Sequence, residues 1–233
     1  MTSSFVMAKD PQGAQGWTGA QFGYSITGWR EVPRDLLSGT PYLFLTRGLS
    51  LTGERMRIGI LSDTHDNLPM VEGAVARLNG ISPDLVLHAG DFVSPFVIPR
   101  LARLSCPCIG VFGNNDGDRI LLAAKAREAG NVEIHGCFTV RQADGRSIAL
   151  LHGHEPGAVD EIAGAGIFDV VVHGHTHRPS ITERGGTLVV NPGEVCGYLT
   201  EKGTIAVLET GRLEVKILEI SQDSFLPADT KGP

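Results

Sequence analysis

Residues 56–67 read M-R-I-G-I-L-S-D-T-H-D-N, and the expected architecture follows from this stretch. A short, β-branched apolar run over residues 57–62 is followed at once by polar residues. Such a run predicts a buried strand. An aspartate, Asp63, and a histidine, His65, therefore stand where that strand ends.

The segments that follow alternate between strand and helix patterns. Leu68, Val71, Val75 and Leu78 recur at helical spacing and predict a helix over residues 68–79. Further helices are expected over 96–104, 119–129 and 155–163. Further strands are expected over 84–88, 108–112, 132–134, 137–142, 147–151, 169–172, 187–190, 203–208 and 213–220. The order begins as βα units and ends mostly in strands, which predicts an α/β fold of two packed sheets with helices outside.

Composition excludes several classes of protein. The chain has 233 residues, 42% apolar and 20% charged, which is typical of a globular protein. No apolar run approaches the ~18 residues of a membrane span, so no membrane partner is expected. The net charge of −6 argues against binding a long nucleic acid through bulk positive charge.

The two ends differ from the middle of the chain. Residues 1–55 hold both tryptophans and show no apolar period, and they lack the features of a signal peptide. We expect them to be a poorly ordered N-terminal extension, with a domain over 56–220 and a polar tail over 221–233. A lid or packing arm formed by residues 1–55 is the alternative, because Trp17 and Trp29 favour packing.

Four cysteines do not make a disulfide framework in a chain of this length. They stand in or beside apolar stretches, so we expect buried, reduced side chains and a cytoplasmic protein.

Polar residues gather at the ends of five predicted strands. Asp63 and His65 follow the first strand, and Asp91 and Asn114 follow the next two. Later strands run into H-G-H at residues 152–154 and H-G-H-T-H at residues 173–177. Ligand sites of α/β proteins form outside the carboxyl ends of strands, so these residues are expected to meet.

Seven of these side chains are candidate metal ligands. Three offer oxygen and four offer imidazole nitrogen: Asp63, His65, Asp91, Asn114, His152, His175 and His177. Seven ligands are too many for one ion, but they supply two ions with four each if one carboxylate bridges. A mixed imidazole and carboxylate set favours Mn, Fe, Ni or Zn over Mg or Ca. An i, i+2 spacing in extended backbone would point His175 and His177, or Asp63 and His65, to one side.

The ordered pattern Asp-x-His, Gly-Asp, Gly-Asn, His and Gly-His-x-His resembles the calcineurin-like metallophosphoesterases. The opening stretch and the later V-V-N-P-G-E at residues 189–194 are similar to the small YfcE-type phosphodiesterase branch. The resemblance covers residues 56 to about 220 and implies an αββα sandwich of two mixed sheets. It also implies two divalent metal ions, Mn above all, and hydrolysis of a small phosphodiester by in-line attack of a metal-bridging hydroxide.

The resemblance implies a role for each site residue. One metal falls to Asp63, His65 and His177, the other to Asn114, His152 and His175, and Asp91 bridges them. Asp91, Asn114 and His154 would then take part in catalysis, and Asn67, Asn115 and His154 would reach the substrate. His88 and His173 are expected to be packing or supporting histidines, and Asp116 to orient a neighbour or cap the following helix.

One position departs from the family pattern. Many members carry a histidine, which serves as general acid or transition-state stabiliser, where this chain has Asn115. An amide cannot deliver a proton to a leaving alkoxide. We therefore expect good activity on aryl phosphodiesters and weak activity on esters with poor leaving groups.

The rival interpretation is a protein-interaction scaffold on the same fold, as in a retromer subunit, and a third is a single-metal or purely structural metal protein. A scaffold needs no intact ligand set, and this chain retains all seven candidates, which favours the enzyme. The sequence does not fix the oligomeric state, and a homo-oligomer is compatible with it.

Overall fold

The apolar runs of the chain form strands that belong to two sheets. The structure, a computed structural model, describes residues 8–9, 15–16 and 55–221. It divides the chain into two units, residues 1–49 and 50–233. In the first unit Ala8–Lys9 (β1) pairs antiparallel with Gln15–Gly16 (β2). Apart from Arg55, the rest of the predicted extension lies outside the described residues, as does the predicted tail after Ser221.

Eleven strands of the second unit make up the two sheets. They are Arg57–Leu61 (β3), Leu85–His88 (β4), Cys108–Val111 (β5), Val132–His135 (β6), Phe138–Ala143 (β7), Arg146–Leu151 (β8), Val170–Val172 (β9), Ser180–Arg184 (β10), Thr187–Asn191 (β11), Gly203–Glu209 (β12) and Glu214–Ile220 (β13). One sheet has the order β13-β12-β3-β4-β5-β6 and the other β10-β11-β9-β8-β7. Both are mixed: β3, β4, β5 and β6 are parallel, as are β8, β9 and β11, while the remaining pairings are antiparallel.

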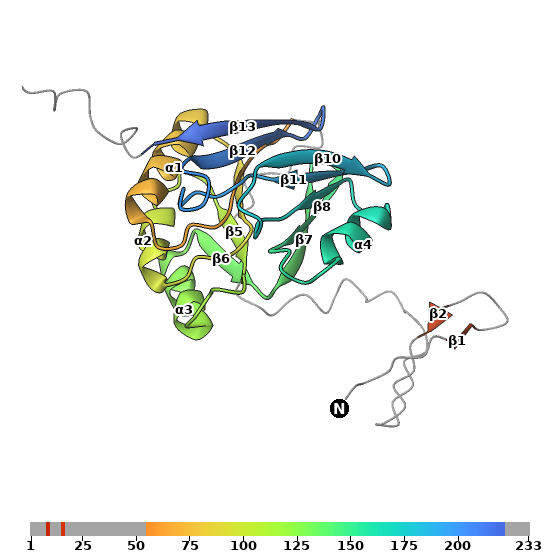
Figure 1. The fold of residues 1–233 in the computed structure, drawn as a ribbon, viewed down its shortest axis with the longest axis horizontal. Helices are drawn as coiled ribbons and strands as arrows, with labels where there is room; N and C mark the ends of the chain where they lie inside the picture. Colours follow the sequence, from red (N-terminus) through yellow and green to blue (C-terminus); the bar gives the residue numbers. More distant parts are fainter. Residues whose placement is uncertain (1–7, 10–14, 17–54, 222–233) are drawn as a thin grey trace, which may run out of the picture. The chain divides into compact units, whose positions relative to one another are not determined.

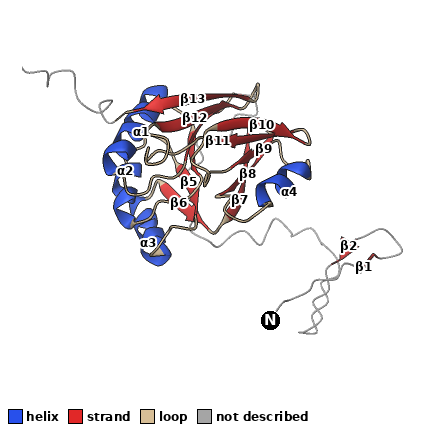
Figure 2. Cartoon of the chain, viewed as in Figure 1, coloured by secondary structure: helices blue, strands red, loops and turns tan. Residues whose placement is uncertain are grey.

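Helices cover the outer faces of the two sheets (Figures 1 and 2). They are Leu68–Ile81 (α1), the 3₁₀ turn Pro95–Val97 (η2), Ile98–Leu101 (α2), Arg119–Ala129 (α3) and Ala158–Gly164 (α4). The first four pack on the six-stranded sheet, with Val71, Leu78 and Leu101 in their core, while α4 packs on the other sheet through Ala163. A third core lies between the sheets, where Ile60, Leu150 and Val172 are fully buried. The predicted αββα sandwich is confirmed.

Two elements differ from the sequence prediction. The helix expected over 96–104 is the 3₁₀ turn η2 and one helical turn. It ends there because Arg103 N and Leu104 N donate to the carbonyls three residues earlier. The exposed strand β10 was not expected, because all five of its side chains face solvent and give no apolar pattern. Gly185 and Gly186, with φ of 59° and 81°, close its hairpin with β11.

Expectations about cysteines were partly wrong. All four cysteines are free, and Cys108 and Cys196 are buried, but Cys137 is exposed and Cys106 is half-buried. Cys106 and Cys137 lie just outside strands. The apolar residues next to them in the sequence therefore do not surround them in the core. No helix in the described part of the chain is long and apolar enough to cross a membrane.

Candidate metal centre

The ends of parallel strands from both sheets carry the predicted ligands to one edge. Asp63 and His65 follow β3, Asp91 follows β4, and Asn114 follows β5. The other sheet contributes His152 after β8, and His175 and His177 after β9. Backbone hydrogen bonds tie the first two loops together, since the carbonyl of Asp91 accepts from the N–H groups of Thr64 and His65 at 3.1 and 3.2 Å.

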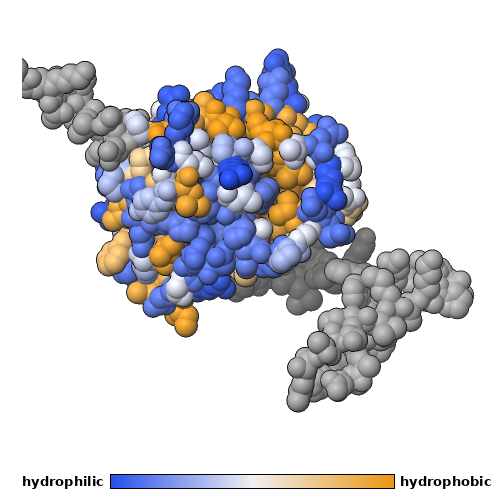
Figure 3. Space-filling view, in the orientation of Figure 1, coloured by the Kyte–Doolittle hydropathy of each residue, from blue (hydrophilic) through white to orange (hydrophobic). Residues whose placement is uncertain are grey.

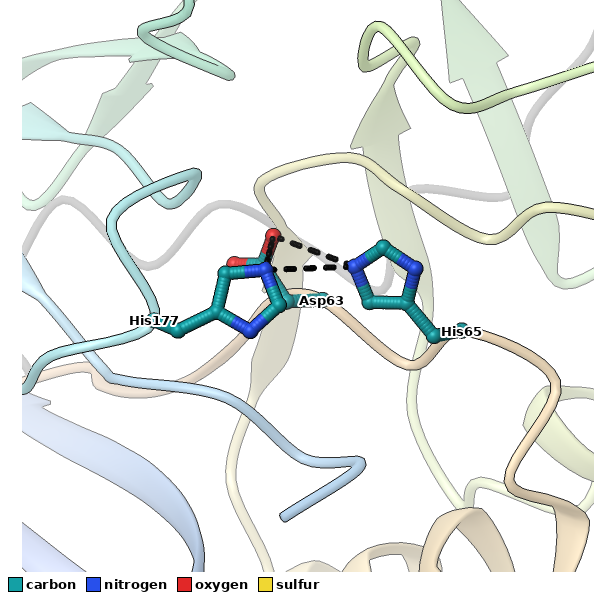
Figure 4. Close-up of side chains that lie close together, drawn as sticks. All are labelled: Asp63, His65 and His177. Atoms are coloured by element: carbon teal, nitrogen blue, oxygen red, sulfur yellow. Dashed lines mark hydrogen bonds and ion pairs between the residues drawn. The ribbon is translucent and has the colours of Figure 1, made fainter. Parts of the chain in front are cut away.

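Asp63, His65 and His177 form the first group of converging side chains (Figure 4). Nε2 of His177 lies 3.4 Å from Oδ1 of Asp63, and Nε2 of His65 lies 3.8 Å from the same atom. The two imidazole nitrogens are 3.3 Å apart. One carboxylate oxygen and two ring nitrogens thus face one small space.

Asp91, Asn114 and His152 form the second group. Nε2 of His152 lies 3.0 Å from Oδ1 of Asn114 and 3.3 Å from Oδ2 of Asp91. The ring of His175 stands 5.2 Å from the ring of His152, centroid to centroid. Oδ2 of Asp91 is also 3.5 Å from Nε2 of His65, so this carboxylate lies between the two groups.

The donor chemistry of both groups fits bound cations. Nδ1 of His152 lies 2.7 Å from the carbonyl of Ala89 and Nδ1 of His177 lies 2.7 Å from a carboxylate of Glu194. Both partners only accept hydrogen bonds, so Nδ1 carries the proton, and in the neutral ring Nε2 presents its lone pair to the site. Those lone pairs face carboxylate and amide oxygens. Oδ1 of Asp63 is buried and accepts no hydrogen bond from any described residue.

Electrostatics in the site also favour positive charge. Burial lowers the pKa of His152, but the hydrogen bond and the charge of Asp91 outweigh this effect and raise it. The contact with Asp63 raises the pKa of His65 against the effect of burial. Burial would raise the pKa of Asp91, yet His152 and Asn115 hold it well below its usual range. The pocket therefore stabilises cationic charge between its carboxylates.

The backbone at the ligands is left-handed rather than extended, which corrects the argument from i, i+2 spacing. Asp63, His65, His175 and His177 have φ of 54°, 40°, 67° and 61°. His177 consequently lies with Asp63 and His65, while His175 lies beside His152. The two histidines therefore belong to different groups. Non-glycine residues rarely adopt this conformation, and its concentration here is typical of a functional site.

Two glycines let the loops approach one another. A Cβ atom on Gly113 would stand 2.2 Å from Oδ1 of Asp91, and one on Gly174 would stand 1.9 Å from Oγ of Ser62 and 2.6 Å from Oδ2 of Asp63. Only glycine leaves room for these contacts, which explains why Gly precedes Asn114 and His175 in their motifs.

The three predicted substrate residues lie around the candidate metal centre, and each makes a different contact there. Nδ2 of Asn67 donates to the carbonyl of Cys196 at 2.7 Å. Asn115 donates to both oxygens of Asp91 at 2.8 Å, one bond from its backbone N–H and one from its side chain. The ring of His154 lies 5.5 Å from that of His152, and its Nε2 is 3.1 Å from Oε1 of Glu155.

The remaining sequence expectations concern supporting residues. His88 is fully buried, stacks on Phe92 at 3.8 Å, and has its pKa lowered by burial to about 3. His173 lies in a part-buried position, and burial lowers its pKa. Asp116 orients neighbours by accepting from the N–H groups of Val93 and Gly113. The helix cap of α3 is Asp118, whose Oδ1 accepts from Leu121 N at 2.9 Å.

Two residues of the centre escaped the sequence analysis. Glu194 contacts His177, and Asn191 holds the histidine loop by donating to the carbonyl of Gly174 and to Oγ1 of Thr176 at 2.9 and 3.0 Å. Asn191 ends β11 and Glu194 follows it, and β11 runs parallel to β9 and so ends at the same edge. The acidic residue of the N-P-G-E motif was the available signal.

Known proteins resemble this chain over the part that builds the centre. Residues 56–212 match the calcineurin-like phosphoesterase superfamily domain. Phosphodiesterase MJ0936 of Methanocaldococcus jannaschii is 39% identical over 161 residues, which cover 69% of this chain and 97% of that protein. The solved structure of an archaeal phosphodiesterase matches with a TM-score of 0.67 at 38% identity, over 70% of this chain and 99% of the other.

More distant structures share the fold alone. YfcE, a phosphoesterase from E. coli, matches with a TM-score of 0.50 at 21% identity, over 71% of this chain and all of its own. Vacuolar protein sorting 29 of Cryptosporidium parvum matches with a TM-score of 0.51 at 20% identity, over 72% of this chain and 98% of its own.

Proposed function

Because the chain belongs to the calcineurin-like phosphoesterase superfamily, we propose that it is a metal-dependent phosphodiesterase acting on a small phosphodiester. The observation that carries the proposal is the convergence of imidazole nitrogens with carboxylate and amide oxygens at the shared edge of the two sheets. Oδ1 of Asn114 and Oδ2 of Asp91 lie 3.0 and 3.3 Å from Nε2 of His152. The lone pairs of these atoms face each other when the His152 ring is neutral. A cation bound among these atoms would stabilise this arrangement.

Two divalent ions suit the two groups of ligands. The first would be held by Asp63, His65 and His177, and the second by Asn114, His152 and His175. Asp91 would contact both, because its Oδ2 lies near the nitrogens of His65 and His152 alike. Manganese is our first choice, with iron, nickel or zinc as alternatives, because imidazole and carboxylate together suit these ions.

When bound, two such ions would supply the chemistry of two-metal hydrolases, which is activation of water, neutralisation of phosphoryl oxygens and orientation of in-line attack. The chain's own residues hold this arrangement in place. Asn115 fixes both oxygens of Asp91, and the Ala89 carbonyl fixes the ring of His152. His154, beside His152 and His175, is available to contact the phosphate.

We place the activity in residues 56–220 and expect a cytoplasmic enzyme whose substrate is smaller than a nucleic acid polymer. The net charge of −6 supports the last point. The face in Figure 3 is mostly hydrophilic, with separate hydrophobic patches, and a homo-oligomer is compatible with it.

The test is hydrolysis after metal reconstitution. The full chain, stripped with a chelator and reloaded with one metal at a time, should hydrolyse bis(p-nitrophenyl) phosphate, with manganese most effective. Phosphomonoesters should react more slowly. Absence of diester hydrolysis with manganese, iron, nickel and zinc would overturn the proposal.

A protein-interaction scaffold is the second candidate, and the likeness to vacuolar protein sorting 29 favours it. The intact set of seven ligands argues against it. Metal binding without any hydrolysis of diesters or monoesters would favour the scaffold over the enzyme.

A further inference from the structure

Glu194 is a fully buried carboxylate that gathers hydrogen bonds from two sides of the centre. Its Oε2 accepts from Nδ1 of His177 at 2.7 Å, from Sγ of Cys196 at 3.0 Å and from Tyr198 N at 3.2 Å. Its Oε1 accepts from Leu199 N at 2.9 Å and from both N and Oγ1 of Thr200 at 2.6 and 2.8 Å. A side chain that was buried only for packing would not need six hydrogen-bond donors.

These contacts keep the carboxylate charged. Its two oxygens accept six hydrogen bonds, three of them from backbone N–H groups that can only donate, and this geometry favours the ionised form. An ionised carboxylate can only accept hydrogen bonds. His177 must therefore carry its proton on Nδ1 whenever its ring is neutral, which leaves the lone pair on Nε2.

The position of Glu194 makes it a support for a ligand rather than a ligand. Glu194, His177 and Cys196 lie close enough together to suggest a separate metal group. The carboxylate oxygens, however, already accept six hydrogen bonds, and one of them comes from Sγ of Cys196 at 3.0 Å, so the thiol is a donor. Nε2 of His177 points the other way, toward Asp63 at 3.4 Å.

The loop over residues 196–200 fixes the carboxylate itself. Five of the six hydrogen bonds come from Cys196, Tyr198, Leu199 and Thr200, so the orientation of Glu194 does not depend on His177. The side chains of Tyr198 and Leu199 are 61% and 72% exposed, so this loop is held by its backbone rather than by packing of those two side chains. The carboxylate of Glu194 is therefore a fixed hydrogen-bond acceptor for His177.

We propose that Glu194 is a positioning residue of the metal centre, which selects the Nδ1-protonated form of His177 and aims its Nε2 at the first metal. The inference rests on the proposed function for the identity of that metal site. Carboxylates that support a ligating histidine commonly change metal affinity by about 10–100-fold. We expect this range for Glu194.

The experiment compares E194Q with T200V in the full chain. E194Q removes the charge that orders His177, while T200V removes one hydrogen bond from the same carboxylate and leaves His177 in contact. Metal dissociation constants, measured by chelator competition with manganese or cobalt, should rise about 10–100-fold in E194Q and less than about threefold in T200V. Equal effects of the two variants, or wild-type affinity in E194Q, would overturn the proposal.

A second measurement covers the case in which E194Q does not fold. In the zinc-loaded wild-type protein, the imidazole ¹⁵N spectrum should show His177 protonated at Nδ1, with assignment by loss of its signals in His177→Gln. A proton on Nε2, or a metal-bound Nδ1, would contradict the proposal. Both readouts are independent of turnover, so a wild-type protein that binds metal without hydrolysing diesters would refute the proposed function alone.

Discussion

Nε2 of His152 lies 3.3 Å from Oδ2 of Asp91, and the sheet edge is built so that this contact favours a positive charge. The opposite ring nitrogen faces the carbonyl of Ala89, so the proton of a neutral ring stays on that side. The pair comes from different sheets, after β8 and β4. A cation bound at this point would therefore join the two sheets of the sandwich, and the first predictions concern its loss.

Asp91→Asn should abolish hydrolysis and release at least one metal ion while the fold remains. The variant keeps the shape of the side chain but loses the charge shared by both ligand groups. We expect turnover to fall by more than the ~10–100-fold typical of residues that only support a ligand. Elemental analysis and turnover of bis(p-nitrophenyl) phosphate measure the two effects. Asp160→Asn, at an exposed ion pair with Arg184, is the matched control. Undiminished turnover in Asp91→Asn would refute the assignment.

Metal removal should lower thermal stability as well as activity. A ligand that binds only the native state at 100 times its Kd contributes about 2.7 kcal/mol. For a domain of this size that corresponds to roughly 5–10 °C in Tm. Unfolding curves with and without manganese measure the shift, which should be smaller in Asp91→Asn. Equal Tm values in metal and chelator would contradict a metal held by the native state.

Activity should depend steeply on the leaving group. The side-chain amide of Asn115 donates a hydrogen bond to Asp91, and an amide has no acidic proton to give to an alkoxide. A series of methyl aryl phosphodiesters should show kcat falling as the pKa of the aryl leaving group rises. Faster turnover of a plain dialkyl phosphate than of a nitrophenyl diester would show that another residue supplies the proton.

Gly174→Ala should destabilise the protein and weaken metal binding. The added Cβ would collide with Oγ of Ser62 and with Asp63, so the histidine loop must move. We expect a loss of about 1–3 kcal/mol in the free energy of unfolding, as for other overpacked positions. Gly80→Ala is the control, since its Cβ meets no described atom within 4 Å and α1 should gain stability. Similar unfolding curves for the two variants would contradict the expected collision.

Glu194 should make the metal-free protein sensitive to acid. Its pKa in the folded state is about 2, below the ordinary value of 4.5, so its contribution is complete above pH 4.5 and is lost as the pH falls toward 2. Denaturant unfolding between pH 3 and 6 should show wild-type stability converging on that of E194Q as the pH falls. A difference between the two that stays constant across this range would show that the carboxylate is not held ionised.

The arrangement of the centre was partly readable from the sequence. Each ligand follows an apolar run that predicts a strand, and parallel strands bring their carboxyl ends together, so Asp63, Asp91 and Asn114 were expected to meet. The direction of the side chains was not readable. The side chains of His175 and His177 point into different ligand groups because both residues adopt left-handed backbone, and no spacing rule predicts that conformation.

The features that escaped prediction have physical reasons of their own. β10 exposes all its side chains, so it carries no hydropathy signal, and only its Gly185-Gly186 turn marks a hairpin. The role of Glu194 depends on a loop that folds back to present three backbone N–H groups. Such groups are identical in every sequence, so their convergence is visible only in three dimensions.

The ligands are divided between two sheets that meet through the side chains of Ile60, Leu150 and Val172. The spacing of the two proposed ion positions would therefore depend on the thickness of this apolar layer, which is remote from the proposed chemistry. A single methylene added or removed in that layer would then be expected to alter ion preference while every proposed coordinating atom stays in place.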